Sequence, residues 1–352
     1  MKIALITDTH WGIRSDNESF HNISKKFMDE VFFKYIDDNE IRTVIHLGDL
    51  VDRRKYININ TARRLREDFI EPLAERELDT HIILGNHDVY YRNTNEVNSV
   101  KELIKDRYPN IKLYENEATE INFDGLDILL IPWICEDNHE QVFEKINTTK
   151  AQVAMGHLEI KGFEMFKGSG ASHGFDRTAF NKFDMVMSGH FHHRSTDGQI
   201  YYLGAHSEFT WSDYNDPKGF HIFDTETREL KFIQNPFKMF SKVEYDDSEG
   251  DIQDTFDYSE FNRTYVKVII VSKNNQYWFD KFIERIEKEN PIQVQIIEQV
   301  YNMDMEEEVI NEAESTIDIF KKYVSNYEDK NINKKKLENK ILEIYSEAIN
   351  LE

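Results

Sequence analysis

Short runs of β-branched and apolar residues recur along the first two thirds of the chain, and each run ends in a turn of Gly, Asp, Asn or His. Runs of this length, bounded by turn residues, are typical of strands buried in a layered α/β domain. The pattern predicts strands at residues 3–7, 43–47, 81–84, 127–131, 152–155, 185–187, 200–203 and 220–223. Apolar residues at helical spacing predict helices at 22–39, 60–76 and 96–107. We therefore expect an α/β domain over residues 1–235.

The pattern changes after residue 235. Residues 265–271 predict a strand, 277–288 predict a helix with Phe279, Phe282 and Ile286 facing inward, and 292–300 predict a second strand after Pro291. These elements predict a small α+β unit over residues 236–303.

Residues 304–352 form a charged, helix-prone segment with narrow apolar stripes, for example Ile310, Ile317 and Phe320, and later Leu337 and Ile341. Such stripes are too small to make a core alone, so the helices need a partner surface. The partner is either the rest of this protein or another chain.

Composition excludes several classes of protein. Hydrophobic residues make up 39% of the 352 residues, which excludes wholesale disorder, and a chain of this length supports more than one core. The single cysteine, Cys135, cannot form an internal disulfide and is expected to be a buried, inert thiol. The first apolar run stops at Asp8 without a cleavage site, and no run approaches the ~20 apolar residues of a membrane span. We expect a cytoplasmic protein with no membrane partner.

The formal net charge of -23 argues against a simple nucleic-acid-binding protein, because phosphate contacts need Lys and Arg. Much of the acid lies in the last third, whereas a basic stretch over residues 53–66 lies close to the chemical motifs described next. The stretch contains Arg53, Arg54, Lys55, Arg63, Arg64 and Arg66. Charge runs are usually solvated faces, so from Arg63 onward that interpretation stays open beside phosphate binding. Bound divalent cations would add positive charge that the formal count omits.

Metal-binding residue types follow five of the predicted strands. Asp8 and His10 follow the first strand in TDTH, and Asp49 follows the second in GDLVD. The other clusters are Asn86, His87 and Asp88 in GNHD, His157 in GH, and His190 and His192 in GHFH. Because the C-terminal strand ends of an α/β layer form one rim, separate clusters are expected to converge there.

These residue types suit a pair of metal ions. Imidazole, carboxylate and one amide oxygen fit manganese, iron or zinc, and a bridging carboxylate such as Asp49 can hold two ions about 3.5 to 4 Å apart. Glycines before Asp49, Asn86, His157 and His190 let the backbone turn sharply beside the ions. Each motif alone is more often a turn, but five in order predict a metallophosphoesterase.

The remaining histidines have simpler interpretations. Six are expected to be structural or exposed, namely His21, His46, His81, His139, His193 and His221. His173, in a glycine-rich loop, and His206 stay open, since either can face a substrate.

The motifs TDTH, GDLVD, GNHD, GH and GHFH resemble those of the calcineurin-like metallophosphoesterases. Their order and spacing are similar to the SbcD-type double-strand-break repair nucleases, including the tailed-phage recombination exonucleases, as are IPWICEDN, GHLEIKGF and NDPKGFHIFDTET. The resemblance implies a metallophosphoesterase β-sandwich flanked by helices over residues 1–235, a DNA-capping α+β domain over 236–303, and C-terminal helices over 304–352 that bind an ATPase.

The resemblance also implies roles for single residues. One ion would be held by Asp8, His10, Asp49 and His192, and the other by Asp49, Asn86, His157 and His190. The metal would be Mn²⁺, with Mg²⁺ or another divalent ion possible. His87 would be a catalytic acid oriented by Asp88, and the products would carry a 5′ phosphate and a 3′ hydroxyl.

The family implies partners and an activity for the whole chain. The partners would be DNA and an SbcC-type coiled-coil ATPase, with two copies of each subunit, and no Walker loop occurs in this sequence. The activity would be 3′-to-5′ exonuclease and single-strand endonuclease cleavage.

Departures from the family pattern leave alternatives open. Asp52 and Arg53 stand where the cellular nucleases have a histidine, and Gly204, Ala205 and His206 replace Gly-Ser-Pro or Gly-Thr-Pro. GDLVDR is also similar to the phosphoprotein phosphatases, in which the arginine contacts phosphate. A phosphatase or small-molecule phosphodiesterase therefore remains the alternative enzyme, and a recombination scaffold the non-enzymatic one.

Overall fold

The computed structural model describes residues 1–166, 169–170 and 174–298. Two predictions fall outside these residues: the partner-binding segment 304–352 and the loop residue His173. No helix in the described part of the chain is both long and apolar enough to cross a membrane.

The first sheet has six strands in the order β14-β13-β1-β2-β3-β4. Four strands are parallel: β1 (Lys2–Ile6), β2 (Thr43–His46), β3 (Asp79–Ile83) and β4 (Ile111–Tyr114). The antiparallel pair β13 (Gly219–Asp224) and β14 (Leu230–Gln234) extends the sheet beyond β1. Parallel pairing points the C-terminal ends of β1, β2 and β3 toward one edge.

The second sheet also has six strands, in the order β11-β12-β10-β7-β6-β5. Its parallel strands are β6 (Leu126–Ile131), β7 (Val153–His157), β10 (Met185–Gly189) and β12 (Ile200–Tyr202). The antiparallel outer strands are β5 (Thr119–Phe123) and β11 (Ser195–Thr196). A separate two-stranded sheet joins β8 (Glu164–Phe166) and β9 (Ser169–Gly170).

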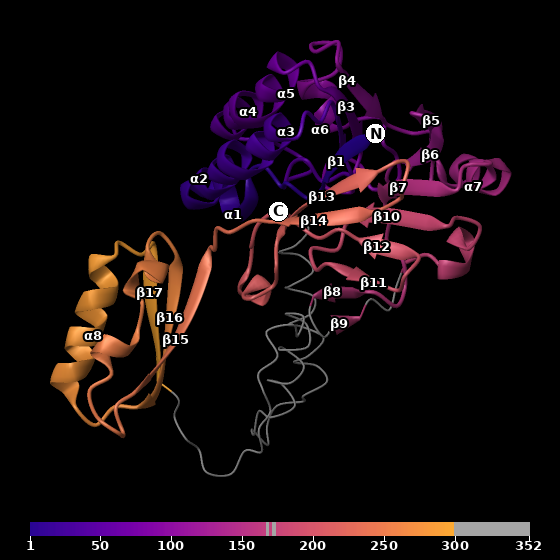
Figure 1. The fold of residues 1–352 in the computed structure, drawn as a ribbon. Helices are drawn as coiled ribbons and strands as arrows, with labels where there is room; N and C mark the ends of the chain where they lie inside the picture. The colour runs from indigo at the N-terminus through magenta and orange to yellow at the C-terminus, as the bar shows by residue number, and fades with distance from the viewer. Residues whose placement is uncertain (167–168, 171–173, 299–352) are drawn as a thin grey trace, which may run out of the picture. The chain divides into compact units, whose positions relative to one another are not determined.

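Helices cover the outer faces of the two sheets (Figure 1). On the first sheet they are α1 (Ile13–Asp16), α2 (Glu18–Phe27), α3 (Lys34–Asp38), α4 (Ile59–Leu65), α5 (Glu71–Glu75) and α6 (Ser99–Leu103). On the second sheet lies α7 (His139–Thr148). An asparagine side chain caps the start of α2, α4 and α6 by accepting a backbone N–H, as Asn98 does from Lys101.

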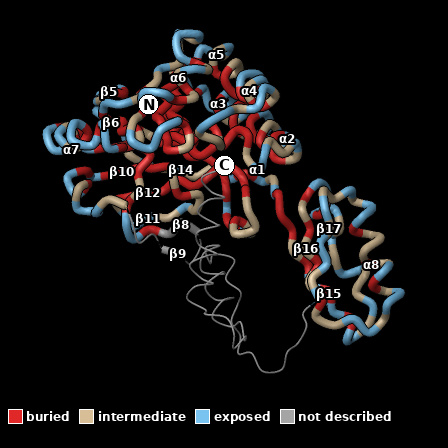
Figure 2. The backbone as a smooth tube through the Cα atoms, turned by 180° about the vertical axis from the view of Figure 1, so that it is seen from behind, coloured by how far each residue is buried: buried red, intermediate tan, exposed pale blue. Residues whose placement is uncertain are grey.

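Three apolar layers follow from the alternation of side chains along the strands. In β1, Ile3 and Leu5 face the second sheet, whereas Ala4 and Ile6 face the helices. Another cluster, with Val142 of α7, fills the outer face of the second sheet. Figure 2 shows the strands buried between exposed helices, so the domain is a helix–sheet–sheet–helix sandwich.

A three-stranded parallel sheet follows the sandwich in the sequence. It pairs β15 (Phe240–Asp246), β16 (Tyr265–Ser272) and β17 (Gln293–Glu298), with α8 (Gln276–Lys288) packed on one face. This sheet and α8 share a separate hydrophobic core, in which Phe282 and Ile286 of α8 are fully buried.

The expected α/β sandwich is confirmed, and all eight strands expected before residue 235 are present within one or two residues of their predicted bounds. The helices differ more from expectation. The two long helices are each interrupted by a π-helical turn, at Met28–Phe33 and Arg66–Ile70, and the third is only α6. Four short 3₁₀ turns complete the helical elements among the described residues, at Arg177–Phe180, Trp211–Asp213, Gln253–Thr255 and Tyr258–Phe261.

Candidate metal centre

The predicted metal-binding residues meet where strand ends from both sheets come together. Asp8 follows β1, Asp49 follows β2, and His190 follows β10 of the other sheet. The backbone amide of Asp8 donates to the Gly48 carbonyl at 3.0 Å, and that of His190 lies 3.2 Å from both carboxylate oxygens of Asp8. These hydrogen bonds fix the loops after β1, β2 and β10 against one another.

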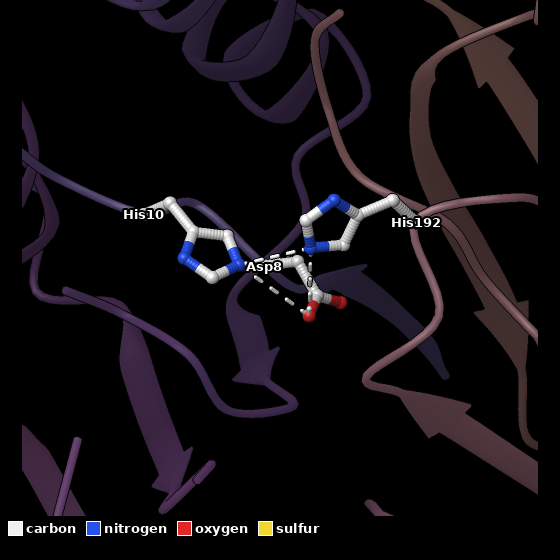
Figure 3. A group of neighbouring side chains, drawn as sticks. All are labelled: Asp8, His10 and His192. Carbon is white, nitrogen blue, oxygen red and sulfur yellow. Dashed lines mark hydrogen bonds and ion pairs between the residues drawn. The ribbon is translucent and has the colours of Figure 1, made fainter. Parts of the chain in front are cut away.

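One group of side chains consists of Asp8, His10 and His192 (Figure 3). The Nε2 atoms of His10 and His192 face each other 3.0 Å apart. The same atoms lie 4.0 and 3.9 Å from Oδ1 of Asp8, and His10 Nε2 lies 3.7 Å from Oδ2 of Asp49. Two imidazoles thus point at one small space that two carboxylates border.

A second group contains Asp49, Asn86, His157 and His190. His157 Nε2 lies 3.2 Å from Oδ2 of Asp49 and 3.1 Å from Oδ1 of Asn86. His190 Nδ1 lies 2.9 Å from the same Asn86 oxygen. Asp49 contacts histidines of both groups through the same oxygen, so it lies where a bridging ligand belongs.

The donor set fits divalent cations. Ligand atoms about 2.1 Å from an ion are about 3.0–3.4 Å from one another, and several of the observed separations fall in or near this range. The amide oxygen of Asn86 is aimed at two imidazoles and accepts only one proton from each at most. A cation satisfies such converging nitrogen and oxygen lone pairs better than the side chains satisfy one another.

Strained backbone accompanies these side chains. Four of the predicted ligands are non-glycine residues with positive φ: Asp8 at 51°, His10 at 44°, Asp49 at 54° and His190 at 89°. Such conformations cost of order 1–3 kcal/mol each and cluster at functional sites. The surrounding sandwich holds these four residues in orientations that an ordinary strand end would not give.

Two of the predicted glycines serve the close approach of the loops. A Cβ atom on Gly85 would lie 2.2 Å from both the backbone nitrogen and Oδ1 of Asp49. Gly48 has a φ of +93°, and a Cβ there would lie 2.5 Å from Nδ1 of His157. Any larger residue at these positions would displace the neighbouring predicted ligand, Asp49 or His157.

Contacts behind the donor atoms orient them. His157 Nδ1 lies 2.8 Å from the Leu47 carbonyl, which can only accept, so Nδ1 carries a proton and Nε2 is the nitrogen directed at Asp49 and at a bound cation. Thr7 Oγ1 donates to Asp8 Oδ2 at 2.7 Å, and Asp52 Oδ1 lies 3.4 Å from Nδ1 of His10. The sequence left Asp52 without a role, and the structure places its carboxylate behind His10, within ion-pair distance of the ring.

The charged side chains of the two groups shift one another's pKa values. Burial opposes protonation of His157, but the Asp49 and Asp8 carboxylates outweigh burial and raise the pKa of His157 to about 9. Burial, followed by the positive charge of His157, lowers the pKa of His190 to about 3. Burial and then His10 lower the pKa of His192 well below its usual range. His190 and His192 are therefore neutral near pH 7, whereas a cation bound by His157 must displace a proton from that ring.

His87 and Asp88 occupy the rim of the site in different ways. The half-buried ring of His87 has its Nδ1 2.5 Å from the Asp52 carbonyl. Asp88 is fully buried and accepts backbone N–H bonds from Leu50, Val51 and Gly85 at 2.9, 3.1 and 2.8 Å. The hydrogen bonds of Asp88 therefore tie two loops together, whereas Nδ1 of the His87 ring, which Asp88 was expected to orient, lies against the Asp52 carbonyl.

Other residues that the sequence singled out lie away from the metal-binding atoms. His206 is fully buried, with Nε2 3.1 Å from Ser24 Oγ, so it does not face a substrate. Arg53 pairs with Asp16 at 2.9 Å. Cys135 is a buried free thiol, as expected. Sequence reasoning missed Trp133, whose ring packs 5.5 Å from that of His190, because an aromatic residue after a strand carries no metal signal.

A helix-flanked double sheet with histidine, carboxylate and amide groups gathered at one strand edge defines the class of metal-dependent phosphoesterases. The model of the calcineurin-like phosphoesterase family matches residues 1–194, and the chain belongs to that family.

Relatives match over most of the chain. It is 36% identical to exonuclease subunit 1 of Enterobacteria phage T4 over 290 residues, which cover 82% of this chain and 81% of that protein. The D subunit of the nuclease SbcCD from Staphylococcus epidermidis is 24% identical over 79% of this chain and 78% of its own length. The corresponding protein from Staphylococcus saprophyticus is 25% identical over 72% and 73%. The similarity therefore extends past the family domain.

Proposed function

We propose that this chain is the nuclease subunit of a DNA recombination or repair complex and hydrolyses DNA phosphodiester bonds with two Mn²⁺ ions. The observation that carries the proposal is the pair of side-chain groups that share Asp49. The names of the relatives, an exonuclease subunit and two nuclease subunits, support a nucleic acid as the substrate over a small phosphoester.

The two groups would each hold one ion. Asp8, His10, Asp49 and His192 would bind the first, and Asp49, Asn86, His157 and His190 the second. Divalent ions at such a site supply a hydroxide at neutral pH and stabilise charge on the phosphoryl oxygens.

His87 is proposed as the acid that protonates the leaving 3′ oxygen. Because the Asp52 carbonyl can only accept, His87 Nδ1 carries a proton, and Nε2 is the atom available for transfer. The ring acts as an acid only in its doubly protonated form, in which Nε2 also carries a proton. Asp88 acts through the loop that carries His87, as a positioning residue.

The test compares purified wild-type protein with His87→Ala on end-labelled duplex and single-stranded DNA and on a small phosphodiester, with Mn²⁺, Mg²⁺ or no metal. We expect Mn²⁺-dependent DNA cleavage that falls by about 10²–10⁴-fold in His87→Ala while bound metal stays unchanged. Loss of both metal and activity would assign His87 to the metal-binding set instead. Cleavage of the small ester without any DNA cleavage would support the phosphatase alternative.

End-labelled products also test the finer parts of the proposal. We propose 3′-to-5′ degradation of duplex ends and endonucleolytic cleavage of single strands, with 5′ phosphate and 3′ hydroxyl products. Label at the 5′ end should therefore be retained in a ladder of shortening fragments. Immediate release of 5′-labelled mononucleotides would reverse the polarity.

We further propose that residues 304–352 bind an SbcC-type ATPase, within a complex of two nuclease and two ATPase subunits, and that residues 236–303 cap the DNA. A chain ending at residue 303 should lose the ATPase in a pull-down but still cleave short DNA. Undiminished ATPase binding by the shortened chain would contradict the assignment of the tail. Sedimentation of the full complex measures its stoichiometry.

A further inference from the structure

Two arginines beside the candidate metal centre are not neutralised by the protein. Arg54 lies in the loop after β2, and Arg92 lies in the loop after β3, where it lines a cavity of about 860 Å³ with Trp133. Among the described residues, no hydrogen bond or ion pair holds either guanidinium. Arg54 is half-buried, so its unpaired charge is unusual.

The other arginines of the same basic stretch are all paired. Their ion pairs are Arg53 with Asp16, Arg63 with Glu67, Arg64 with Glu18, and Arg66 with Glu71. The acidic chain therefore has carboxylates available for this stretch but places none of the described ones within ion-pair distance of Arg54.

The two loops are fixed to each other and to the metal-binding residues. The His87 backbone amide donates to Asp49 Oδ1 at 2.7 Å, and Nδ1 of the same residue lies 2.5 Å from the Asp52 carbonyl. Arg54 follows Asp52 by two residues and Arg92 follows Asp88 by four, so both arginines extend from anchored backbone next to the site.

The two positive charges act on each other. Burial, followed by the charge of Arg92, lowers the pKa of the Arg54 guanidinium, and the Asp49 carboxylate only partly opposes the shift. Bringing like charges together without a counter-ion costs free energy, and an anion bound by both removes that cost. Guanidinium groups bind phosphate oxygens through paired N–H donors, which makes a phosphate group the best matching anion.

We propose that Arg54 and Arg92 together bind one backbone phosphate of the DNA, next to the phosphate that is cleaved. This inference rests on the proposed nuclease function and adds a substrate-binding subsite to it. Exposed rings in the same two loops, Tyr56 at 58% and Tyr91 at 50%, offer stacking surfaces for the neighbouring nucleotides. The subsite holds the strand so that one particular linkage reaches the metal-binding residues.

The first experiment measures Mn²⁺-dependent cleavage of a short DNA by Arg54→Gln, Arg92→Gln and the control Arg63→Gln, whose arginine is exposed and paired with Glu67. We expect KM to rise roughly ten- to hundredfold for the first two variants and to stay within about twofold for the control. The slope of log KM against log salt should fall by about one in each of the two variants. Equal KM values and salt slopes for all three variants would overturn the inference.

A second experiment locates the phosphate. DNA strands each carrying one uncharged methylphosphonate linkage are compared position by position near the cleaved bond. In the wild type, one flanking position should raise KM as much as Arg92→Gln does, and the two changes together should add nothing further. Fully additive effects at every position would show that the arginines do not bind a phosphate there.

Two controls separate this inference from its alternatives. If the wild type cleaves no DNA, the proposed function fails before the subsite is tested, whereas wild-type cleavage with unaffected variants rejects the subsite alone. Because the arginines repel each other in the free protein, neither substitution should lower Tm. A clear drop in Tm would assign the arginines a structural role instead.

Discussion

Replacing Gly85 with alanine tests whether the close approach of two loops sets the position of the shared carboxylate. The added Cβ would lie 2.2 Å from the backbone nitrogen and Oδ1 of Asp49, about 1.2 Å closer than ordinary contact begins. One atom belongs to the backbone and the other accepts the His87 backbone N–H, so the loop carrying Asp49 must move.

The size of the effect follows from that displacement. Overpacking of this kind costs about 1–3 kcal/mol of stability. A shift of about 1 Å in a reacting group can cost 10²-fold in rate. We therefore expect Gly85→Ala to lose at least about 100-fold in Mn²⁺-dependent phosphodiester hydrolysis, with a Tm lower by only several degrees.

Gly125→Ala is the matched control. Gly125 lies in the turn between β5 and β6 with a φ of +90°, and no heavy atom lies within 4 Å of a Cβ built there. Alanine in this conformation costs about 1–2 kcal/mol without touching the site. Both variants should thus lose similar stability, and only Gly85→Ala should lose hydrolysis and bound metal, measured by elemental analysis. Hydrolysis and metal content near wild-type values in Gly85→Ala would refute the reasoning.

Three further predictions concern buried polar groups. Asp88→Asn leaves at least one of three backbone N–H groups without an acceptor, and we expect a loss of about 2–4 kcal/mol in the free energy of unfolding by urea, together with reduced turnover. Glu208→Ala removes the acceptor for the buried backbone amides of Met239 and Phe240 at the start of β15. This variant should lose a similar free energy of unfolding but still hydrolyse a small phosphodiester. Burial, followed by Arg194, lowers the pKa of His221 to about 3, so its contribution to stability is complete above about pH 6.5 and is lost as pH falls toward 3. His221→Phe should therefore flatten the decline in stability between pH 6 and 4 by up to about 1.4 kcal/mol per pH unit, and an unchanged slope would contradict this assignment.

The strands were predictable because burial on both faces leaves a continuous apolar run that ends abruptly at a polar turn. In β1 the run from Ile3 to Ile6 supplies both the intersheet layer and the helix-facing layer. The same runs predicted where the polar clusters lie, since each cluster follows a strand end. The sequence predicted where the helical regions lie but not that two of them divide into several helices. The π-helical turns that interrupt them leave the spacing of apolar residues almost unchanged.

Tertiary contacts explain what the sequence did not reveal about the site. Asp52 lies three residues after Asp49 in the sequence and contacts two different histidines. Its side-chain carboxylate faces His10, and its backbone carbonyl faces His87. Asp88 was expected to orient the ring of His87. In the structure its carboxylate accepts hydrogen bonds from three backbone amides of two loops. Neither arrangement follows from residue type or spacing, because each depends on how the loop after β2 lies against the loop after β3.

The negative charge of the chain illustrates the same limit. A net charge of -23 and a basic stretch near the motifs point in opposite directions, but most of that stretch is neutralised locally. The arginines of α4 pair with carboxylates on neighbouring helical elements, so their charge is balanced locally. Among the described arginines of the loops after β2 and β3, Arg54 and Arg92 have no ion-pair partner, and Arg92 lies outside the basic stretch altogether. An acidic protein can therefore bind a polyanion where a few cations are left unpaired at the site itself, and the total charge does not decide the matter.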